Sequence, residues 1–151
     1  MNRIKYLIGL IIVGLAFLLL VPLVFGKTSY PNYKGYVNDF ADVLSPQYEQ
    51  QLETKLREYE EKTTNEIAVV TVKNLNGESV EEYTINLAEQ WKVGKAKEDN
   101  GVIFLTAIDD RKTRIEVGYG NEEKLTDIEA GRILDGVTPY YKEGKYEAGL
   151  S

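Results

Sequence analysis

The chain contains neither cysteine nor histidine, and both absences restrict its chemistry. Without cysteine there is no disulfide framework, no thiol nucleophile and no structural zinc site of the usual kind. Without histidine there is no Ser-His-Asp triad, no phosphohistidine and no imidazole ligand for a metal. Any acid–base catalysis must therefore use Asp, Glu, Lys, Tyr or a bound water molecule.

Several motifs of well-known enzymes are also missing. The sequence has no GxxxxGK[ST] phosphate loop, no GxSxG nucleophile elbow and no twelve-residue EF-hand loop. Asp39-Phe40-Ala41-Asp42 lacks the DxDx[TV] order that aspartyl-phosphate chemistry needs. Gly118-Tyr119-Gly120 lacks the third glycine of a dinucleotide loop, so its glycines are expected to allow positive φ and close backbone approach. Covalent phosphoryl transfer and dinucleotide binding are therefore unsupported.

Charge is absent from one long apolar run, residues 6–25, which follows Arg3 and Lys5. About twenty apolar residues span a bilayer as a helix, whereas the apolar core of a signal peptide is usually about 7–15 residues long. The run predicts an uncleaved anchor. A cleaved signal peptide is the alternative, because residues 24–26 are spaced as a signal peptidase requires. The basic residues keep the N-terminus inside, so the rest lies on the extracytoplasmic side of the cell membrane, or is secreted after cleavage.

Acidic residues outnumber basic residues in the remainder of the chain. All 24 acidic residues and 16 of the 18 basic residues follow position 26, which gives this part a formal net charge of −8. Nucleic acids and anionic lipid head groups both require a basic surface, so neither is an expected partner. The N-terminal helix is the expected contact with the membrane. The acidic excess makes cations natural ligands.

The chain divides into three parts. Residues 1–26 form the anchor or signal peptide, the polar stretch 27–35 with Pro31 predicts a linker, and one domain occupies residues 36–151. The first part of the domain, residues 36–44, has a mixed pattern that predicts extended or looped chain.

Apolar patterns then predict helices alternating with strands. Continuous apolar runs at 67–72 and 101–108 predict two central strands, and the alternation at 113–117 predicts an edge strand. Apolar residues at helical spacing, after the predicted caps Ser45 and Ser79, predict two helices. The capping box Thr126–Glu129 predicts a third helix, which should end near Asp135 because Gly136 and Pro139 follow. Helices are expected over 46–62, 80–91 and 126–135, with the first turn of another cut short at Ser151. The order indicates an α/β fold, a three-layer α/β/α sandwich around a small mixed sheet.

Acidic and amide side chains concentrate in the predicted loops. They are Asp39, Asp42, Asp99, Asn100 and Glu122. Hard cations such as calcium take six to eight oxygen ligands from carboxylates, amides, backbone carbonyls and water, and loops at one end of a sheet can supply them together. Alternatively, Asp39 and Asp99 accept hydrogen bonds from backbone amides in tight turns, as Asp and Asn commonly do.

Six short stretches, in this order, make the sequence resemble the TPM domain family, also called the YgcG family, which includes thylakoid-lumen acid phosphatases. The stretches are VNDFADVLS (37–45), EIAVVTV (66–72), WKVG (91–94), DNGV (99–102), VGYG (117–120) and PYYKEGKY (139–146). The resemblance implies an α/β/α sandwich with a shallow cavity of acidic loop residues that holds a divalent cation, calcium or magnesium. By position, Asp39, Asp99 and Asn100 match the family's acidic motifs, and Glu122 matches them more loosely.

The resemblance leaves two classes of function open. In the first, the domain is a cation-holding interaction module outside the membrane that supports an envelope or membrane protein complex. In the second, it is a metal-dependent phosphomonoesterase in which the ion activates water. Asp99 would then hold the ion, Asp39 would hold it or orient the water, and Arg111 would meet the phosphate oxygens. Lys95 and Lys97 are further candidates for the phosphate contact.

Overall fold

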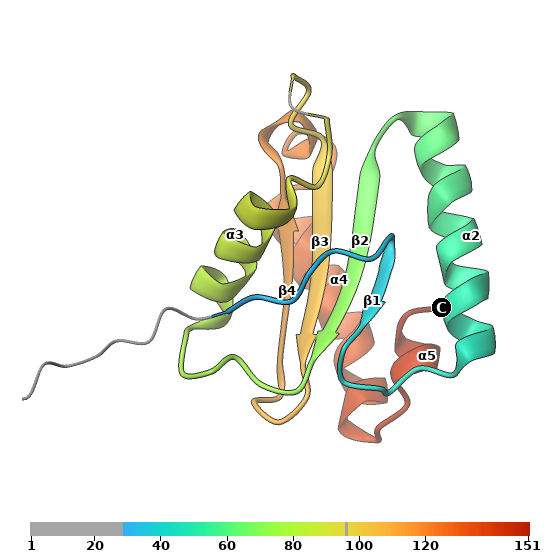
Figure 1. The fold of residues 1–151 in the computed structure, drawn as a ribbon, viewed down its shortest axis with the longest axis vertical. Helices are drawn as coiled ribbons and strands as arrows, with labels where there is room; N and C mark the ends of the chain where they lie inside the picture. The colour runs from blue at the N-terminus through green and yellow to red at the C-terminus, as the bar shows by residue number, and fades with distance from the viewer. Residues whose placement is uncertain (1–28, 96) are drawn as a thin grey trace, which may run out of the picture.

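The computed structural model describes residues 29–95 and 97–151 of the chain (Figure 1). The predicted anchor or signal peptide, residues 1–26, lies outside these residues. In the part that is described, no helix combines the length and the apolar character needed to cross a bilayer.

A mixed four-stranded sheet forms the centre of the domain. Its strands lie in the order β1 (Val37–Asp39), β2 (Glu66–Val72), β3 (Gly101–Ala107) and β4 (Lys112–Val117). The first three are parallel, and β4 runs antiparallel to β3. The predictions of an α/β fold, of central strands β2 and β3, and of an edge strand β4 are confirmed. β1 is the opposite edge strand, and its pairing with β2 turns a segment of mixed pattern into a strand.

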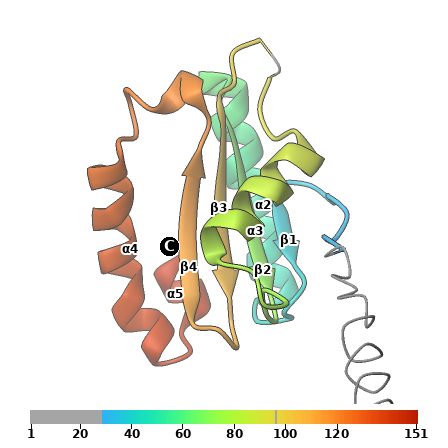
Figure 2. The ribbon, with the colours of Figure 1, turned by 90° about the vertical axis from the view of Figure 1, so that its left-hand side faces the viewer.

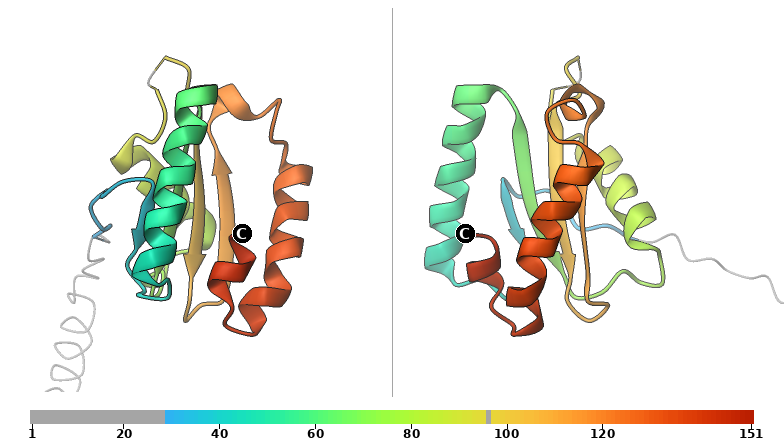
Figure 3. Two further views of the ribbon diagram at one scale, coloured as in Figure 1. Left: turned by 90° about the vertical axis from the view of Figure 1, so that its right-hand side faces the viewer. Right: turned by 180° about the vertical axis from the view of Figure 1, so that it is seen from behind.

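Helices cover both faces of the sheet. Helix α3 (Val80–Trp91) lies on one face, and helices α2 (Pro46–Thr63) and α4 (Asp127–Lys142) lie on the other (Figures 1 and 3). The short segments η1 (Tyr119–Asn121) and α5 (Tyr146–Gly149) precede and follow α4.

Each face of the sheet has its own apolar core, because successive side chains of a strand point to opposite faces. Val69 and Phe104 belong to the cluster under α2 and α4. Their neighbours Val70 and Ile103 belong to the cluster under α3, together with Trp91, the predicted core residue. Full burial of such a side chain contributes about 1.5–3 kcal/mol relative to its exposure, so both helical layers are held mainly by these strands.

The three long helices begin where the sequence predicts caps. The hydroxyls of Ser45, Ser79 and Thr126 each accept a hydrogen bond from a backbone N–H of the first turn. At Thr126 the capping box is complete, because the Glu129 carboxylate accepts a hydrogen bond from the Thr126 backbone at 2.9 Å. This hydrogen bond holds the pKa of Glu129 below its usual value.

The predicted end of the third helix near Asp135 is wrong. Helix α4 continues through Gly136 and Pro139 to Lys142. Proline removes one helical hydrogen bond, but Val137 and Tyr141 pack against the apolar core beyond that point. The packing of Val137 and Tyr141 on the core stabilises the helix by more than Gly136 and Pro139 destabilise it. Gly136 and Pro139 are both exposed.

Close backbone packing fixes the loop between α3 and β3. A Cβ atom on Gly101 would overlap the carbonyl oxygen of Val93, and a Cβ atom on Gly120 would overlap the carbonyl oxygen of Glu98. The backbone N–H of Gly120 donates a hydrogen bond to the carbonyl oxygen of Asp99 at 2.9 Å. Neither Gly118 nor Gly120 has a positive φ, so close approach rather than positive φ explains the Gly-Tyr-Gly sequence.

We expect Gly120→Ala to destabilise the fold and displace residues 98–100, because the added methyl group occupies the position of a backbone oxygen. Overpacking of this kind typically costs about 1–3 kcal/mol of unfolding free energy. Gly136→Ala is the control, since a Cβ atom there meets nothing within 4 Å and Ala favours a helix over Gly by about 0.5–1 kcal/mol. Denaturant unfolding of both variants measures the effects. A Gly120→Ala chain as stable as the Gly136→Ala chain would contradict the packing argument.

Candidate functional site

The strand directions place the loops at two opposite ends of the sheet (Figures 1 and 2). At the first, named the Asp99 end, β2 and β3 begin and β4 ends. At the second, named the Asp39 end, β1, β2 and β3 end and β4 begins. Along β2, Glu66 pairs with Gly101 and Thr71 pairs with Asp39. Five residues of strand at about 3.3 Å each separate these levels by about 16 Å.

The structure therefore divides the predicted site into two groups. Asp39 and Arg111 lie at the Asp39 end, whereas Asp99, Asn100 and Glu122 lie at the Asp99 end. Calcium–oxygen distances are about 2.3–2.6 Å, so one ion cannot contact both Asp39 and Asp99. The expectation that these loops come together at one end of the sheet is corrected, because Asp39 is the last residue of a parallel strand and Asp99 precedes the start of another.

Asp39 holds the loop that leads to α2. One carboxylate oxygen accepts hydrogen bonds from the backbone N–H groups of Val43 at 2.9 Å and Leu44 at 2.8 Å. The other oxygen accepts a hydrogen bond from the Thr71 hydroxyl. Both carboxylate oxygens of Asp39 thus accept hydrogen bonds from neighbouring groups of the protein. This matches the alternative in which Asp39 accepts hydrogen bonds from backbone amides in a tight turn.

Asn100 also serves the fold. Asn100 is buried. Its side-chain oxygen accepts a hydrogen bond from the Lys95 backbone N–H at 2.9 Å, and its side-chain amide donates one to the Thr64 carbonyl at 2.6 Å. Its own backbone carbonyl accepts a hydrogen bond from the side chain of Asn121 at 2.7 Å. A metal ion could take the side-chain oxygen only by breaking the contact that positions the loop.

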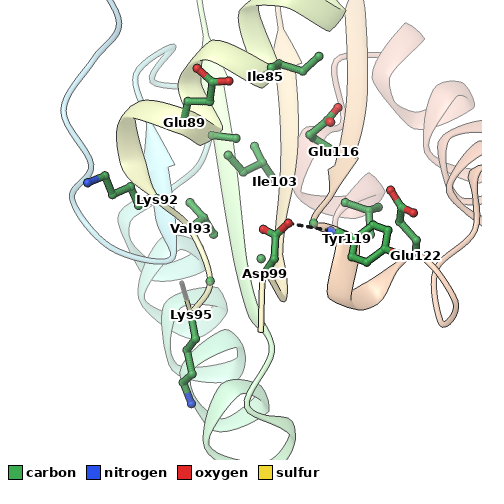
Figure 4. A pocket seen from close by; sticks show the side chains of 15 residues that line it. Ile85, Glu89, Lys92, Val93, Lys95, Asp99, Ile103, Glu116, Tyr119 and Glu122 are labelled. Atoms are coloured by element: carbon green, nitrogen blue, oxygen red, sulfur yellow. Dashed lines mark hydrogen bonds between the residues drawn. The ribbon is translucent and has the colours of Figure 1, made fainter. Parts of the chain in front are cut away.

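Asp99, in contrast, is exposed and lines a cavity of about 500 Å³ between α3 and β4 (Figure 4). Its backbone adopts a left-handed conformation with φ of 45°, which Asp tolerates better than most residues. The carboxylate accepts a hydrogen bond from the Tyr119 backbone N–H at 3.2 Å. Glu122 lines the same cavity, so two of the predicted metal ligands do share one site.

The lining of the Asp99 cavity combines an apolar floor with charged side chains. Ile85, Ile103 and Val117 contribute to the floor. The cavity is lined by four acidic residues and two lysines. They are Glu89, Asp99, Glu116, Glu122, Lys92 and Lys95. The Glu116 carboxylate is paired with Arg114 at 2.7 Å.

Sequence reasoning missed Glu89 and Glu116. Glu89 lies on the exposed side of a helix and Glu116 on a strand with an alternating pattern, where acidic residues are common and carry no signal of a site. Only the packing of α3 beside β4 brings them to the cavity that Asp99 lines.

A hard cation could be held in this cavity only with water or backbone oxygens among its ligands. Among the described residues, no three acidic side chains converge closely enough to hold an ion alone. Calcium accepts water and backbone carbonyls among its six to eight oxygen ligands and tolerates irregular geometry. Asp99 and Glu122 are therefore the two carboxylates of the cavity that could contribute to holding such an ion.

Comparison with known proteins supports the resemblance. The family model for the TPM domain matches residues 37–151. The solved N-terminal domain of a protein from P. gingivalis is 35% identical with a TM-score of 0.70, and the alignment covers 76% of this chain and 74% of that one. No functionally curated protein matches the chain.

Two more distant solved structures share the fold. The N-terminal domain of the cg2496 protein from Corynebacterium glutamicum is 16% identical with a TM-score of 0.61, over 82% of this chain and 77% of that one. The BA42 protein from Bizionia argentinensis is 21% identical with a TM-score of 0.61, over 71% of this chain and 73% of that one. With the family model matching most of its length, the chain belongs to the TPM domain family.

Proposed function

We propose that this domain is an extracytoplasmic, membrane-tethered module that binds a divalent cation and docks on an envelope or membrane protein complex. The observation that carries the proposal is the position of Tyr119. Tyr119 is 79% exposed, and it lines the cavity together with Asp99 and Glu122. Exposed tyrosines are enriched among the residues that dominate protein interfaces.

The proposed ion links the cavity to this tyrosine. Asp99 holds the Tyr119 backbone through its carboxylate, so an ion bound by Asp99 and Glu122 would fix the segment that presents the ring. Calcium is the expected ion, with magnesium as the alternative, because an incomplete and irregular set of protein ligands suits calcium better. Asp39 and Asn100 are omitted from this ligand set, since their side-chain oxygens accept hydrogen bonds from the fold.

The phosphomonoesterase stays as a second candidate, in a changed form. Arg111 and Asp39 are too far from Asp99 to act on one phosphate group. Lys92 and Lys95 belong to the lining of the Asp99 cavity. Their ammonium groups point away from Asp99 (Figure 4), so they would have to turn inward to meet phosphate oxygens there. In this form Asp99 would hold an ion that activates water.

We expect calcium to raise the melting temperature of the full chain in nonionic detergent, because the ion binds the folded state. Extracellular calcium modules bind at about 10⁻⁴–10⁻³ M. About 10 mM calcium then adds roughly 1.4–2.7 kcal/mol of stability, or roughly 5–10 °C. Asp99→Asn should abolish most of this shift. Asp109→Asn is the charge-matched control, since Asp109 is exposed in the hairpin at the Asp39 end. Equal melting temperatures in calcium and in chelator would refute cation binding.

For the hydrolase, the measurement is phosphomonoester hydrolysis by the purified full chain with calcium or magnesium. If Asp99 holds a catalytic ion, Asp99→Ala should lower the rate by at least about 100-fold, a typical loss when transition-state charge stabilisation is removed. The Asp109→Ala chain, prepared in the same way, should keep the wild-type rate. Equal rates in all three preparations would exclude this mechanism and leave the binding module.

Location is tested with protease. Residues 6–25 are the proposed tether, and Arg3 and Lys5 before them place the domain outside. Protease added to intact spheroplasts should therefore digest the domain, while a cytoplasmic marker protein stays intact. A domain that resists digestion until the cells are lysed, and is then cleaved, would overturn the proposed location.

A further inference from the structure

A second cavity, of about 450 Å³, lies at the Asp39 end between the β3–β4 hairpin, the last turns of α4, and α5. Figure 3 shows these three elements at the same end of the sheet. Five of its lining residues carry hydroxyl groups and two are cationic. They are Thr106, Thr113, Thr138, Tyr141, Tyr146, Arg111 and Lys142. No carboxylate is among the lining residues described, although residues 27–151 as a whole carry a formal net charge of −8. We call this space the Arg111 cavity.

Three acidic residues of the surrounding elements are engaged elsewhere. The Asp110 carboxylate accepts a hydrogen bond from the Leu75 backbone at 2.8 Å. Glu143 pairs with Lys145 at 2.6 Å. Glu147 accepts a hydrogen bond from the Ser45 backbone at 2.7 Å, which lowers the pKa of Glu147.

The two cations of the cavity, in contrast, have no carboxylate partner in residues 29–95 and 97–151. The four ion pairs found there involve other basic residues. Arg111 lies in the hairpin turn with φ of 53°, and its backbone N–H donates to the Ile108 carbonyl at 3.2 Å. Its guanidinium and the Lys142 ammonium are therefore available to an anion.

Thr106 gives an independent indication of a ligand. The residue is 4% exposed, and its buried hydroxyl makes no hydrogen bond of normal geometry within the described residues. The Tyr141 side chain interacts with Thr106. Burial raises the pKa of Tyr141 to about 12, although the interaction with Thr106 lowers it, so Tyr141 keeps its proton. An unpaired buried hydroxyl is costly, and a ligand oxygen in the cavity would satisfy it.

We propose that the Arg111 cavity binds a small oxyanion group, a carboxylate or a phosphate, between two cations and a set of hydroxyl donors. Arg111 and Lys142 neutralise the charge, and Thr106 and Tyr141 donate hydrogen bonds from the buried side. The site is proposed to bind the anion, and no chemical step is assigned to it. It lies at the opposite end of the sheet from Asp99, so the proposal does not depend on the cation.

The test follows amide NMR resonances of the full chain in nonionic detergent. Inorganic phosphate and acetate are titrated separately to millimolar concentration, with chloride at equal ionic strength as the salt control. Saturable shifts centred on Thr106, Arg111 and Lys142 are expected with at least one of the two anions, and the anion that binds more tightly identifies the group. Arg111→Gln should weaken binding at least about tenfold, as loss of a charge-assisted hydrogen bond does.

Lys55→Gln is the matched control, because Lys55 is an exposed lysine of α2 and does not line the cavity. It should leave the anion affinity unchanged. Thr106→Val should weaken binding while keeping side-chain volume. If the Thr106→Val chain fails to fold, the Arg111→Gln chain still tests the proposal, because Arg111 is exposed in a turn and its replacement should leave the fold intact. Shifts no larger than those in chloride, or equal weakening by Arg111→Gln and Lys55→Gln, would overturn the proposal.

Discussion

The contact between backbones at the Asp99 end is the constraint on which the candidate cation site depends. Gly101 and Gly120 have no Cβ, so the carbonyl groups of Val93 and Glu98 can lie directly against their Cα atoms. Buried Asn100 then ties the same loop to Thr64 and Lys95. Because the glycines and Asn100 fix the loop through its main chain, the Asp99 side chain is not needed to hold the loop and faces the cavity. There its carboxylate accepts a hydrogen bond from the Tyr119 backbone N–H.

Local signals in the sequence predicted the strands β2, β3 and β4, the caps and the close backbone approach at Gly118-Tyr119-Gly120, but not the relative position of Asp39 and Asp99. Deciding which loops share one end of a sheet requires the direction of each strand. β1 is three residues long and has no pattern of its own, so its direction could not be compared with that of β3. Once Val37 pairs in parallel with Val69, Asp39 necessarily lies at the end of one strand, while Asp99 precedes the start of another.

Tertiary packing explains the other departures from the sequence prediction. Helix α4 continues through Gly136 and Pro139 because buried Val137 and partly buried Tyr141 pack on the apolar core beyond Asp135, where local propensity would end the helix. Glu89 reaches the Asp99 cavity for a similar reason, since α3 lies beside β4 only in the folded domain. Neither result is contained in a window of neighbouring residues, because each depends on a surface supplied by a distant strand.

The separation of the two ends has an electrostatic consequence. Carboxylates predominate in the Asp99 cavity and cations in the Arg111 cavity, and about 16 Å of strand lies between them. The Debye length is about 8 Å at physiological ionic strength, so charges at one exposed end are largely screened from the other. A cation and an oxyanion bound at these ends would therefore interact weakly through solvent. The sheet thus keeps opposite charges from neutralising each other, and each cavity retains the charge that its proposed ligand requires.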